Sequence, residues 1–374
     1  MNILKKIIKT KDRSNFFFIT IIITILILDI SLTFLSKKIT LFFEKNNNMM
    51  AEHHVYHHEL KKNYEGKGRL TELIKTNSYG LITLPDVKPN FSDYKNNYVF
   101  LGDSFTQGAG IQYNKSYSGI LTEKLSSENI NIINLSAISY SPSIYFSKTK
   151  FFIENYDLKF SKLFLFLDIS DPYDELYRYE YKNQRVISRT NKDTFFQKQK
   201  PYFMQLIKKF VKNNTTVTKF ILVNLNNLIF KNKEEIDFFQ QYGFYINHQA
   251  NLWTYDKNYF NEEGYKGIEL SKKYLIELKK ILEKQEAELT LIVYPWPGQI
   301  YRNDKNFMQV NIWNNWAKKN KINFVDLSPI FFKGDLSSED KRLKIIDKYY
   351  FSGDMHFNEQ GHKLIADHLL KVIK

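Results

Sequence analysis

Five short runs of aliphatic, β-branched and aromatic residues, separated by amphipathic stretches, constrain the fold of this chain most strongly. Runs of this kind are typical of buried strands in a parallel sheet with crossover helices on its faces. Apolar residues recur with helical spacing over 264–283, and a last helix is expected from Asn358. The sequence therefore predicts a doubly wound α/β domain. Its predicted strands are 98–104, 131–137, 162–170, 289–296 and 322–328.

Residues that follow these strands are the first candidates for a site, because doubly wound sheets bind ligands beyond the carboxyl ends of their strands. The segment GDSFTQG at 102–108 places Ser104 on a tight turn at the start of a helix, where backbone N–H groups suit an oxyanion. A serine nucleophile needs a base that a third group orients. GDMHFNEQGH at 353–362 supplies His356 as the base and Asp354 as the orienting group. Each block alone is equally consistent with a turn or a helix cap.

Together and in this order, the two blocks resemble the SGNH (GDSL-type) hydrolase superfamily over residues 96–374. The resemblance implies a flavodoxin-like three-layer fold with five parallel strands, here with a helical insertion at about 178–262. It also implies ester hydrolysis or acyl transfer through a serine acyl intermediate, without a metal or other cofactor. The spacing of Asp354 and His356 is similar to the D-x-H of the SGNH-like proteins that O-acetylate exported alginate.

The resemblance further implies an oxyanion hole made by the backbone N–H groups of Ser104 and Ser136 together with Ser170. The family's second block usually ends in glycine where this chain has Ser136, and its third block has asparagine where this chain has Ser170. A serine keeps a backbone N–H and a hydroxyl, so both positions can still donate. Loss of one oxyanion donor costs about 100- to 1000-fold in rate.

Further polar and aromatic side chains near the strand ends have two interpretations each. Asp168, Asp171 and Asp174 can cap the helix that follows them or, less favoured, bind a cation, so no metal site is assigned. Aromatic rings such as those of Trp296 and Tyr301 can stack on a sugar or pack in the core. If Asp354 does not orient the base, Asp326 is the next candidate. The substrate-binding candidates are Asp103, Trp296, Gln299 and Tyr301.

The segment 16–35 is about as long and apolar as a helix that crosses a bilayer. Positive residues are in excess before it, which predicts a cytoplasmic N-terminus and a catalytic domain in the periplasm or outside the cell. The sequence thus predicts a tail and transmembrane anchor over 1–40 and a polar juxtamembrane connector over 41–95. A histidine cluster in this connector is assigned to packing because its spacing does not suit a metal. Its members are His53, His54, His57 and His58.

The net charge of +14 would suit an anionic partner, but the lysines are scattered and no nucleic-acid-binding motif is present. No nucleic-acid partner is therefore expected. The absence of cysteine from the sequence excludes disulfides and thiol catalysis.

The sequence as a whole predicts a membrane-anchored SGNH serine hydrolase or O-acyltransferase that acts on carboxylic, and specifically acetyl, esters of a cell-envelope glycan. The alternative is a catalytically altered module of the same fold that binds envelope glycan or membrane partners. A basic surface-binding protein is a third hypothesis, favoured only if the lysines converge on one face.

Overall fold

The chain forms two compact units, one from Met1–Asn48 and Thr194–Asp237 and the other from Met49–Asp193 and Phe238–Lys374. In the first unit of this computed structural model, the described residues are all helical. The second unit holds the sheet and the candidate site. The structure describes residues 20, 23–24, 27–35, 49–70, 72–84, 89–189, 238–305 and 307–373.

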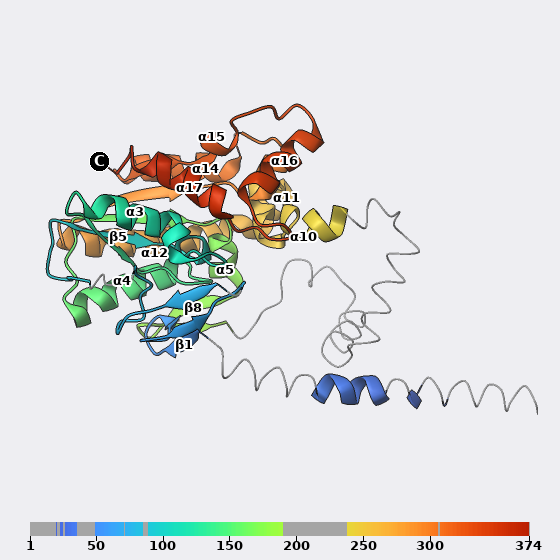
Figure 1. Ribbon diagram of the computed structural model, residues 1–374, viewed down its shortest axis with the longest axis horizontal. Coiled ribbons are helices and arrows are strands. Elements are labelled where there is room, and N and C mark those ends of the chain that lie inside the picture. The colour runs from blue at the N-terminus through green and yellow to red at the C-terminus, as the bar shows by residue number, and fades with distance from the viewer. Residues whose placement is uncertain are drawn as a thin grey trace, which may run out of the picture. The chain divides into compact units, whose positions relative to one another are not determined.

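A five-stranded parallel sheet lies at the centre of the second unit (Figure 1). Its strands lie in the order β6-β5-β7-β10-β11, which is the order of a flavodoxin-like doubly wound sheet. All five predicted strands and the predicted α/β class with a parallel sheet are confirmed. The strands are β5 (Asn97–Leu101), β6 (Asn131–Asn134), β7 (Lys162–Leu167), β10 (Glu288–Val293) and β11 (Asn323–Asp326).

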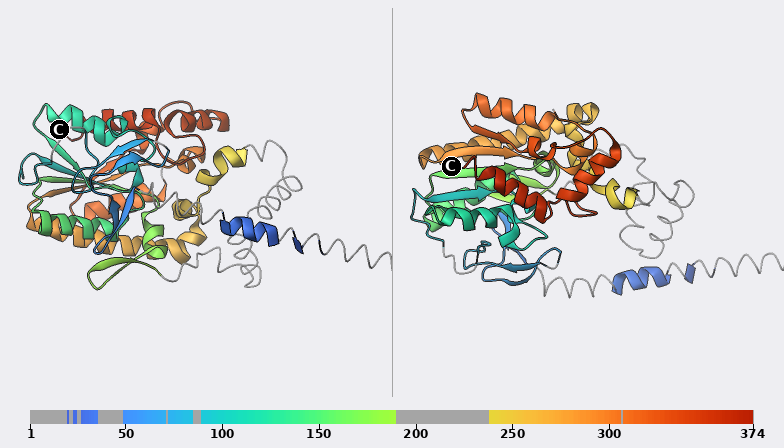
Figure 2. Two further views of the ribbon diagram at one scale, coloured as in Figure 1. Left: turned by 60° about the horizontal axis from the view of Figure 1, so that its bottom comes forward. Right: turned by 45° about the horizontal axis from the view of Figure 1, so that its top comes forward.

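Helices cover both faces of this sheet, which explains why its central strands are apolar on both sides (Figure 2). One face carries α3 (Tyr117–Ser126) and α17 (Glu359–Leu369), and the other carries α4 (Pro142–Tyr156) and α12 (Tyr265–Lys284). The helix α12 matches the crossover helix predicted over 264–283. The other helices along this half of the chain are α13 (Pro297–Tyr301), α14 (Met308–Lys319), α15 (Ser328–Phe331) and α16 (Glu339–Tyr349).

The predicted polar connector over 41–95 instead contains two β-hairpins that pack on the domain. The first pairs β1 (Met50–His53) with β2 (His57–Leu60), and the second pairs β3 (Glu65–Lys67) with β4 (Leu73–Lys75). Tyr56 and Leu60 of the first hairpin are buried. These strands are only three or four residues long, too short to give a period-two pattern that sequence reasoning could detect.

The described part of the predicted helical insertion begins with another hairpin, formed by β8 (Tyr179–Lys182) and β9 (Arg185–Ser188). Asn183 and Gln184 both have positive φ, as the two central residues of a type I′ turn require. Residues 190–237 of the insertion lie outside the described part. The helical turns after them are η2 (Phe239–Gly243), α10 (Phe244–Ile246), η3 (Gln249–Thr254), α11 (Lys257–Tyr259) and η4 (Phe260–Gly264).

The membrane prediction requires a correction. Only residues 20, 23–24 and 27–35 of the predicted span over 16–35 are described. Among the described parts of the chain, no helix has both the length and the apolar character needed to cross a membrane. This finding contradicts the predicted single-pass anchor, on which the predicted placing of the catalytic domain depended.

Candidate active site

Ser104 lies on a sharp turn between β5 and the short helix α2 (Ser104–Gln107). The carboxylate of Asp103 caps this helix by accepting a hydrogen bond from the backbone N–H of Phe105 at 3.0 Å. The turn needs glycine at position 102, since a Cβ there would lie 2.1 Å from Thr106 Oγ1 and 3.1 Å from the carbonyl oxygen of Phe166. The sequence thus brings the Ser104 hydroxyl to the carboxyl end of the sheet.

The Ser104 hydroxyl meets the His356 imidazole there, although the two residues are 252 positions apart. Ser104 Oγ lies 2.7 Å from His356 Nε2, and His356 Nδ1 lies 2.6 Å from Asp354 Oδ1. The ring of Phe105 stacks on the imidazole at 4.6 Å between centroids. The three residues therefore have the contacts that a nucleophile, a base and an orienting carboxylate require.

Asp354 does not cap the last helix. That role belongs to Asn358, whose side chain accepts hydrogen bonds from the N–H groups of Gln360 and Gly361. Burial alone would raise the pKa of Asp354. The hydrogen bond from His356, together with the charges of His356 and Arg69, lowers that pKa below its usual range instead, which keeps the group an acceptor. The alternative candidate Asp326 accepts from the N–H of Ser328 at the end of β11.

Two of the three expected oxyanion donors are engaged elsewhere in this structure. The N–H of Ser136 donates to Asn134 Oδ1 at 3.0 Å. The hydroxyl and the N–H of Ser170 both donate to Asp168 Oδ2, at 2.5 Å and 2.8 Å. The backbone N–H of Ser104 is in the first turn of α2, where N–H groups have no intrahelical acceptor.

The acidic residues after β7 hold their own turn together. Asp168 accepts from Ser170 and from the indole N–H of Trp296, and Asp171 Oδ2 accepts from the N–H of Asp168 at 2.9 Å. Burial raises the pKa of Asp174 to about 7 despite the nearby charge of Arg178. Burial, with the charges of Asp168 and Asp174, also raises the pKa of Asp103 well above its usual range. No group of three or more potential metal ligands occurs among the described residues.

Two of the substrate-binding candidates, Trp296 and Gln299, are too buried in this structure to meet a sugar. Trp296 is 1% exposed, and Gln299 is 2% exposed with its amide bonded to the N–H of Trp296 and to Thr254. Tyr301 is half-buried against Phe238. Asp103 touches the nucleophile, with Ser104 Oγ 3.3 Å from its Oδ2, but it is itself buried. Trp296 therefore packs in the core, which was the second interpretation of its ring.

Three residues outside the predicted triad, oxyanion and substrate-binding sets support the site. Arg69, 287 positions before His356, forms an ion pair with Asp354, with 2.6 Å between Arg69 Nη2 and Asp354 Oδ2. Gln107 accepts a hydrogen bond from the N–H of Ile138, and His58 Nε2 lies 2.8 Å from the carbonyl oxygen of the same residue. These two contacts fix the loop that contains Ser136. Gln107 had a sequence signal in its position three residues after Ser104 on one helical face, and His58 belonged to the histidine cluster assigned to packing. Arg69 had no such signal.

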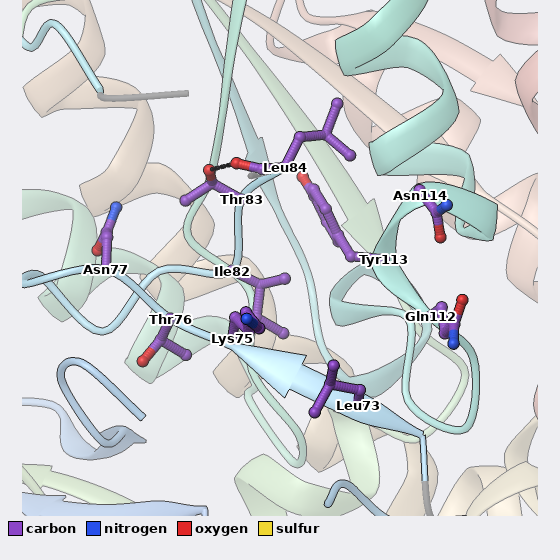
Figure 3. Close-up of a pocket in the computed structure, with 10 residues that line it drawn as sticks. All are labelled: Leu73, Lys75, Thr76, Asn77, Ile82, Thr83, Leu84, Gln112, Tyr113 and Asn114. Carbon is purple, nitrogen blue, oxygen red and sulfur yellow. Dashed lines mark hydrogen bonds between the residues drawn. The ribbon is translucent and has the colours of Figure 1, made fainter. Parts of the chain in front are cut away.

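A cavity of about 380 Å³ lies beside the β3–β4 hairpin (Figure 3). Leu73 of β4 and Ile82 line it from one side, and Tyr113 lines it from the loop before α3. Neither Ser104 nor His356 belongs to its lining. It is therefore not the binding pocket for a group attacked by Ser104.

No model of a known protein family and no curated protein matches the sequence. Solved structures do match. A G-D-S-L family lipolytic protein from Desulfitobacterium hafniense is 12% identical, with 74% of this chain and 99% of that chain covered and a TM-score of 0.39. An acetyl xylan esterase is 12% identical, with 74% and 100% covered and a TM-score of 0.39. A psychrotrophic esterase from Pseudoalteromonas is 14% identical, with 74% and 96% covered and a TM-score of 0.35.

These matches carry the names of esterases and of the G-D-S-L family, the superfamily that the two sequence blocks resemble. The similarity to O-acetylating proteins has no counterpart in them. Because the identities and TM-scores are low, the chemistry of the site rests on this chain's own contacts.

Proposed function

We propose that this chain is a serine ester hydrolase of the SGNH (GDSL-type) kind, with Ser104 as nucleophile, His356 as general base and acid, and Asp354 as the orienting carboxylate. The observation that carries the proposal is the continuous series of contacts from Ser104 Oγ through both ring nitrogens of His356 to Asp354, at 2.7 Å and 2.6 Å. A serine hydroxyl becomes an effective nucleophile when such a base and a third group are in place.

The reaction follows from these contacts. Ser104 Oγ attacks the ester carbonyl carbon while its proton passes to His356 Nε2. The ester bond breaks, the leaving alcohol takes that proton, and the acyl group stays on Ser104. Water then attacks the acyl carbon, its proton passes to Nε2 and on to Ser104 Oγ, and the carboxylic acid leaves. Asp354 keeps the proton of the imidazole on Nδ1 and stabilises the imidazolium in both halves.

The proposed oxyanion donors are the N–H groups of Ser104 and Ser136. Ser136 donates to the Asn134 side chain in the absence of substrate, so this amide has to move when a tetrahedral oxyanion forms. Ser170 is left out because its hydroxyl is held by Asp168. With two donors rather than three, we expect turnover about 100- to 1000-fold below that of a site with a complete oxyanion hole.

Acyl transfer uses the same acyl-enzyme and differs only in whether water or an acceptor hydroxyl reaches it. The proposal stops at carboxylic esters because Trp296 and Gln299, the side chains expected to face a glycan, are buried. The engaged donors at Ser136 and Ser170 favour a second candidate, a module of the same fold without catalysis. The orientation of Ser104 toward His356 favours the enzyme.

The test is turnover of aryl esters of acetate, butyrate and octanoate by the full chain, with and without sugar acceptors. We expect hydrolysis that disappears in Ser104→Ala and persists in a control, Ser127→Ala, at the end of α3. Acylated sugar in place of free acid would redirect the proposal to transfer. Equal rates for the native chain and Ser104→Ala would refute it and favour the non-catalytic module.

A further inference from the structure

The β3–β4 hairpin, which sequence analysis placed in a connector, reaches the candidate active site. Its two strands, Glu65–Lys67 and Leu73–Lys75, are joined by a turn that contains Arg69. We propose that Arg69 is a positioning residue that sets the orientation of Asp354 and, through it, of the His356 imidazole. This inference rests on the proposed function.

The Arg69 guanidinium forms a short ion pair with the carboxylate of Asp354. Arg69 Nη2 lies 2.6 Å from Asp354 Oδ2, and Arg69 Nη1 lies 2.6 Å from His356 Nδ1. The side chain of Asp354 is 13% exposed and that of Arg69 is 34% exposed. Solvent screening is therefore reduced at the carboxylate, where the pair exerts its effect.

The two contacts of His356 Nδ1 exclude one another as hydrogen bonds, because this nitrogen either donates a proton or accepts one. If Nδ1 donates to Asp354, Nε2 is unprotonated and can take the proton of Ser104. If Nδ1 accepts from Arg69, Nε2 carries the proton and cannot act as a base. The reactive tautomer thus needs Arg69 to act on the carboxylate rather than on the ring.

Asp354 has a geometric need for such a partner. Because it lies only two residues before His356, its Oδ1 accepts both from the backbone N–H of His356 at 3.2 Å and from Nδ1 at 2.6 Å. The second oxygen, Oδ2, is the one that Arg69 binds. Without Arg69, Oδ2 would lose a charged donor in a largely buried place, and the carboxylate could rotate away from Nδ1.

Glu72 fixes the turn that presents Arg69. Its carboxylate accepts hydrogen bonds from the N–H groups of Arg69 at 3.0 Å, Leu70 at 2.6 Å and Gly110 at 2.8 Å. Gly110 lies three residues after the end of the nucleophile helix, and a Cβ on it would lie 2.9 Å from Leu70 Cδ1. Glu72 thus ties the hairpin to the segment that carries Ser104, so the position of Arg69 is set relative to the nucleophile.

The test compares Arg69→Met with Lys75→Met, which removes the same charge from the same hairpin but only an exposed pair with Glu65. We expect Arg69→Met to lower kcat on the order of 100-fold with KM unchanged, as for a misplaced catalytic group, and Lys75→Met to leave both constants unchanged. Arg69→Lys keeps the positive charge but lacks the two-pronged guanidinium, so its kcat should lie between those of the native chain and Arg69→Met. Native kcat in both Arg69 variants would overturn the proposal.

A second readout does not depend on turnover. The proton shared by His356 Nδ1 and Asp354 should give a far-downfield proton NMR resonance in the native chain and in Lys75→Met. We expect it to weaken or vanish in Arg69→Met and in Glu72→Gln. Its full persistence in Arg69→Met would overturn the positioning role. A native chain that shows the resonance, loses it in Arg69→Met and hydrolyses no ester would refute the proposed function while leaving the role of Arg69 intact. If Arg69→Met does not fold, the same measurements on Arg69→Lys and Glu72→Gln test the positioning role of Arg69.

Discussion

Asp354 shows how a single residue gains a role from its surroundings. In the sequence it could equally cap the last helix or orient His356. The structure gives the cap to Asn358 and leaves Asp354 with three donors, namely the N–H and the Nδ1 of His356 and the guanidinium of Arg69. The pKa of Asp354 lies below its usual range because these three partners lower it more than burial raises it.

Replacement of Asp354 by asparagine should therefore cost activity far more than folding. Asn keeps the shape of the side chain but can stabilise the wrong tautomer of the imidazole, so we expect kcat to fall on the order of 10⁴-fold. The measurement is kcat and melting temperature of Asp354→Asn beside Asp340→Asn, an exposed acidic residue in α16. An active but destabilised Asp354→Asn protein would move the orienting role elsewhere.

The stability of the Asp354→Asn variant should also depend on pH differently from that of the native chain. Because the pKa of Asp354 is lower in the folded chain than in the unfolded chain, its contribution to stability is fully present above pH ~4. It is lost as the pH falls from there toward the folded-state value. The stability difference between the native chain and Asp354→Asn should accordingly shift toward the variant below pH ~4.

At the scale of elements, the sequence predicted those strands and helices that have a clear hydrophobic pattern. The five sheet strands and α12 were found within a few residues because each has a sustained run of apolar or amphipathic residues. The hairpins β1–β2, β3–β4 and β8–β9 were missed. Their strands have three or four residues, and they are stabilised by tertiary contacts, such as those of Tyr56 with Lys148 and of Glu72 with Gly110, rather than by a local pattern.

The docking of the β1–β2 hairpin on α4 can be measured through Lys148. This ammonium donates to the hydroxyl of Tyr140 at 3.0 Å and lies over the rings of Tyr56 and Phe152 at 5.4 Å and 5.6 Å. Burial lowers its pKa to about 7, although Glu59 opposes the shift. Between pH ~7 and pH ~10 the unfolded chain therefore binds a proton that the folded chain does not, so stability rises with pH in this window.

Lys148→Met should lose this pH dependence, since it removes the lysine whose pKa burial lowers into this window. We expect the melting temperature of the native chain to rise relative to Lys148→Met between pH ~7 and pH ~10. Lys150→Met, a partly exposed lysine of the same helix paired with Glu154, provides the control. A constant difference between native and Lys148→Met across this range would show that Lys148 is charged in the fold.

At the scale of the whole molecule, the site is built from three distant parts of the chain. Ser104 follows the first strand of the central sheet, His356 and Asp354 precede the last helix, and Arg69 comes from a hairpin before the sheet. The first two parts could be predicted because both blocks lie at positions that the α/β topology brings together. Arg69 could not, because its role depends on the docking of a hairpin that has no signal of its own.

The central claim is that Ser104 is a nucleophile activated by His356, and covalent labelling tests it most directly. The full chain is treated with a fluorophosphonate probe, digested, and the modified peptide is identified by mass spectrometry. The account predicts one adduct per chain, located on Ser104, absent in Ser104→Ala and strongly slowed in His356→Ala, with Ser127→Ala labelled like the native chain. An unlabelled native chain, or an adduct on a different serine, would contradict it.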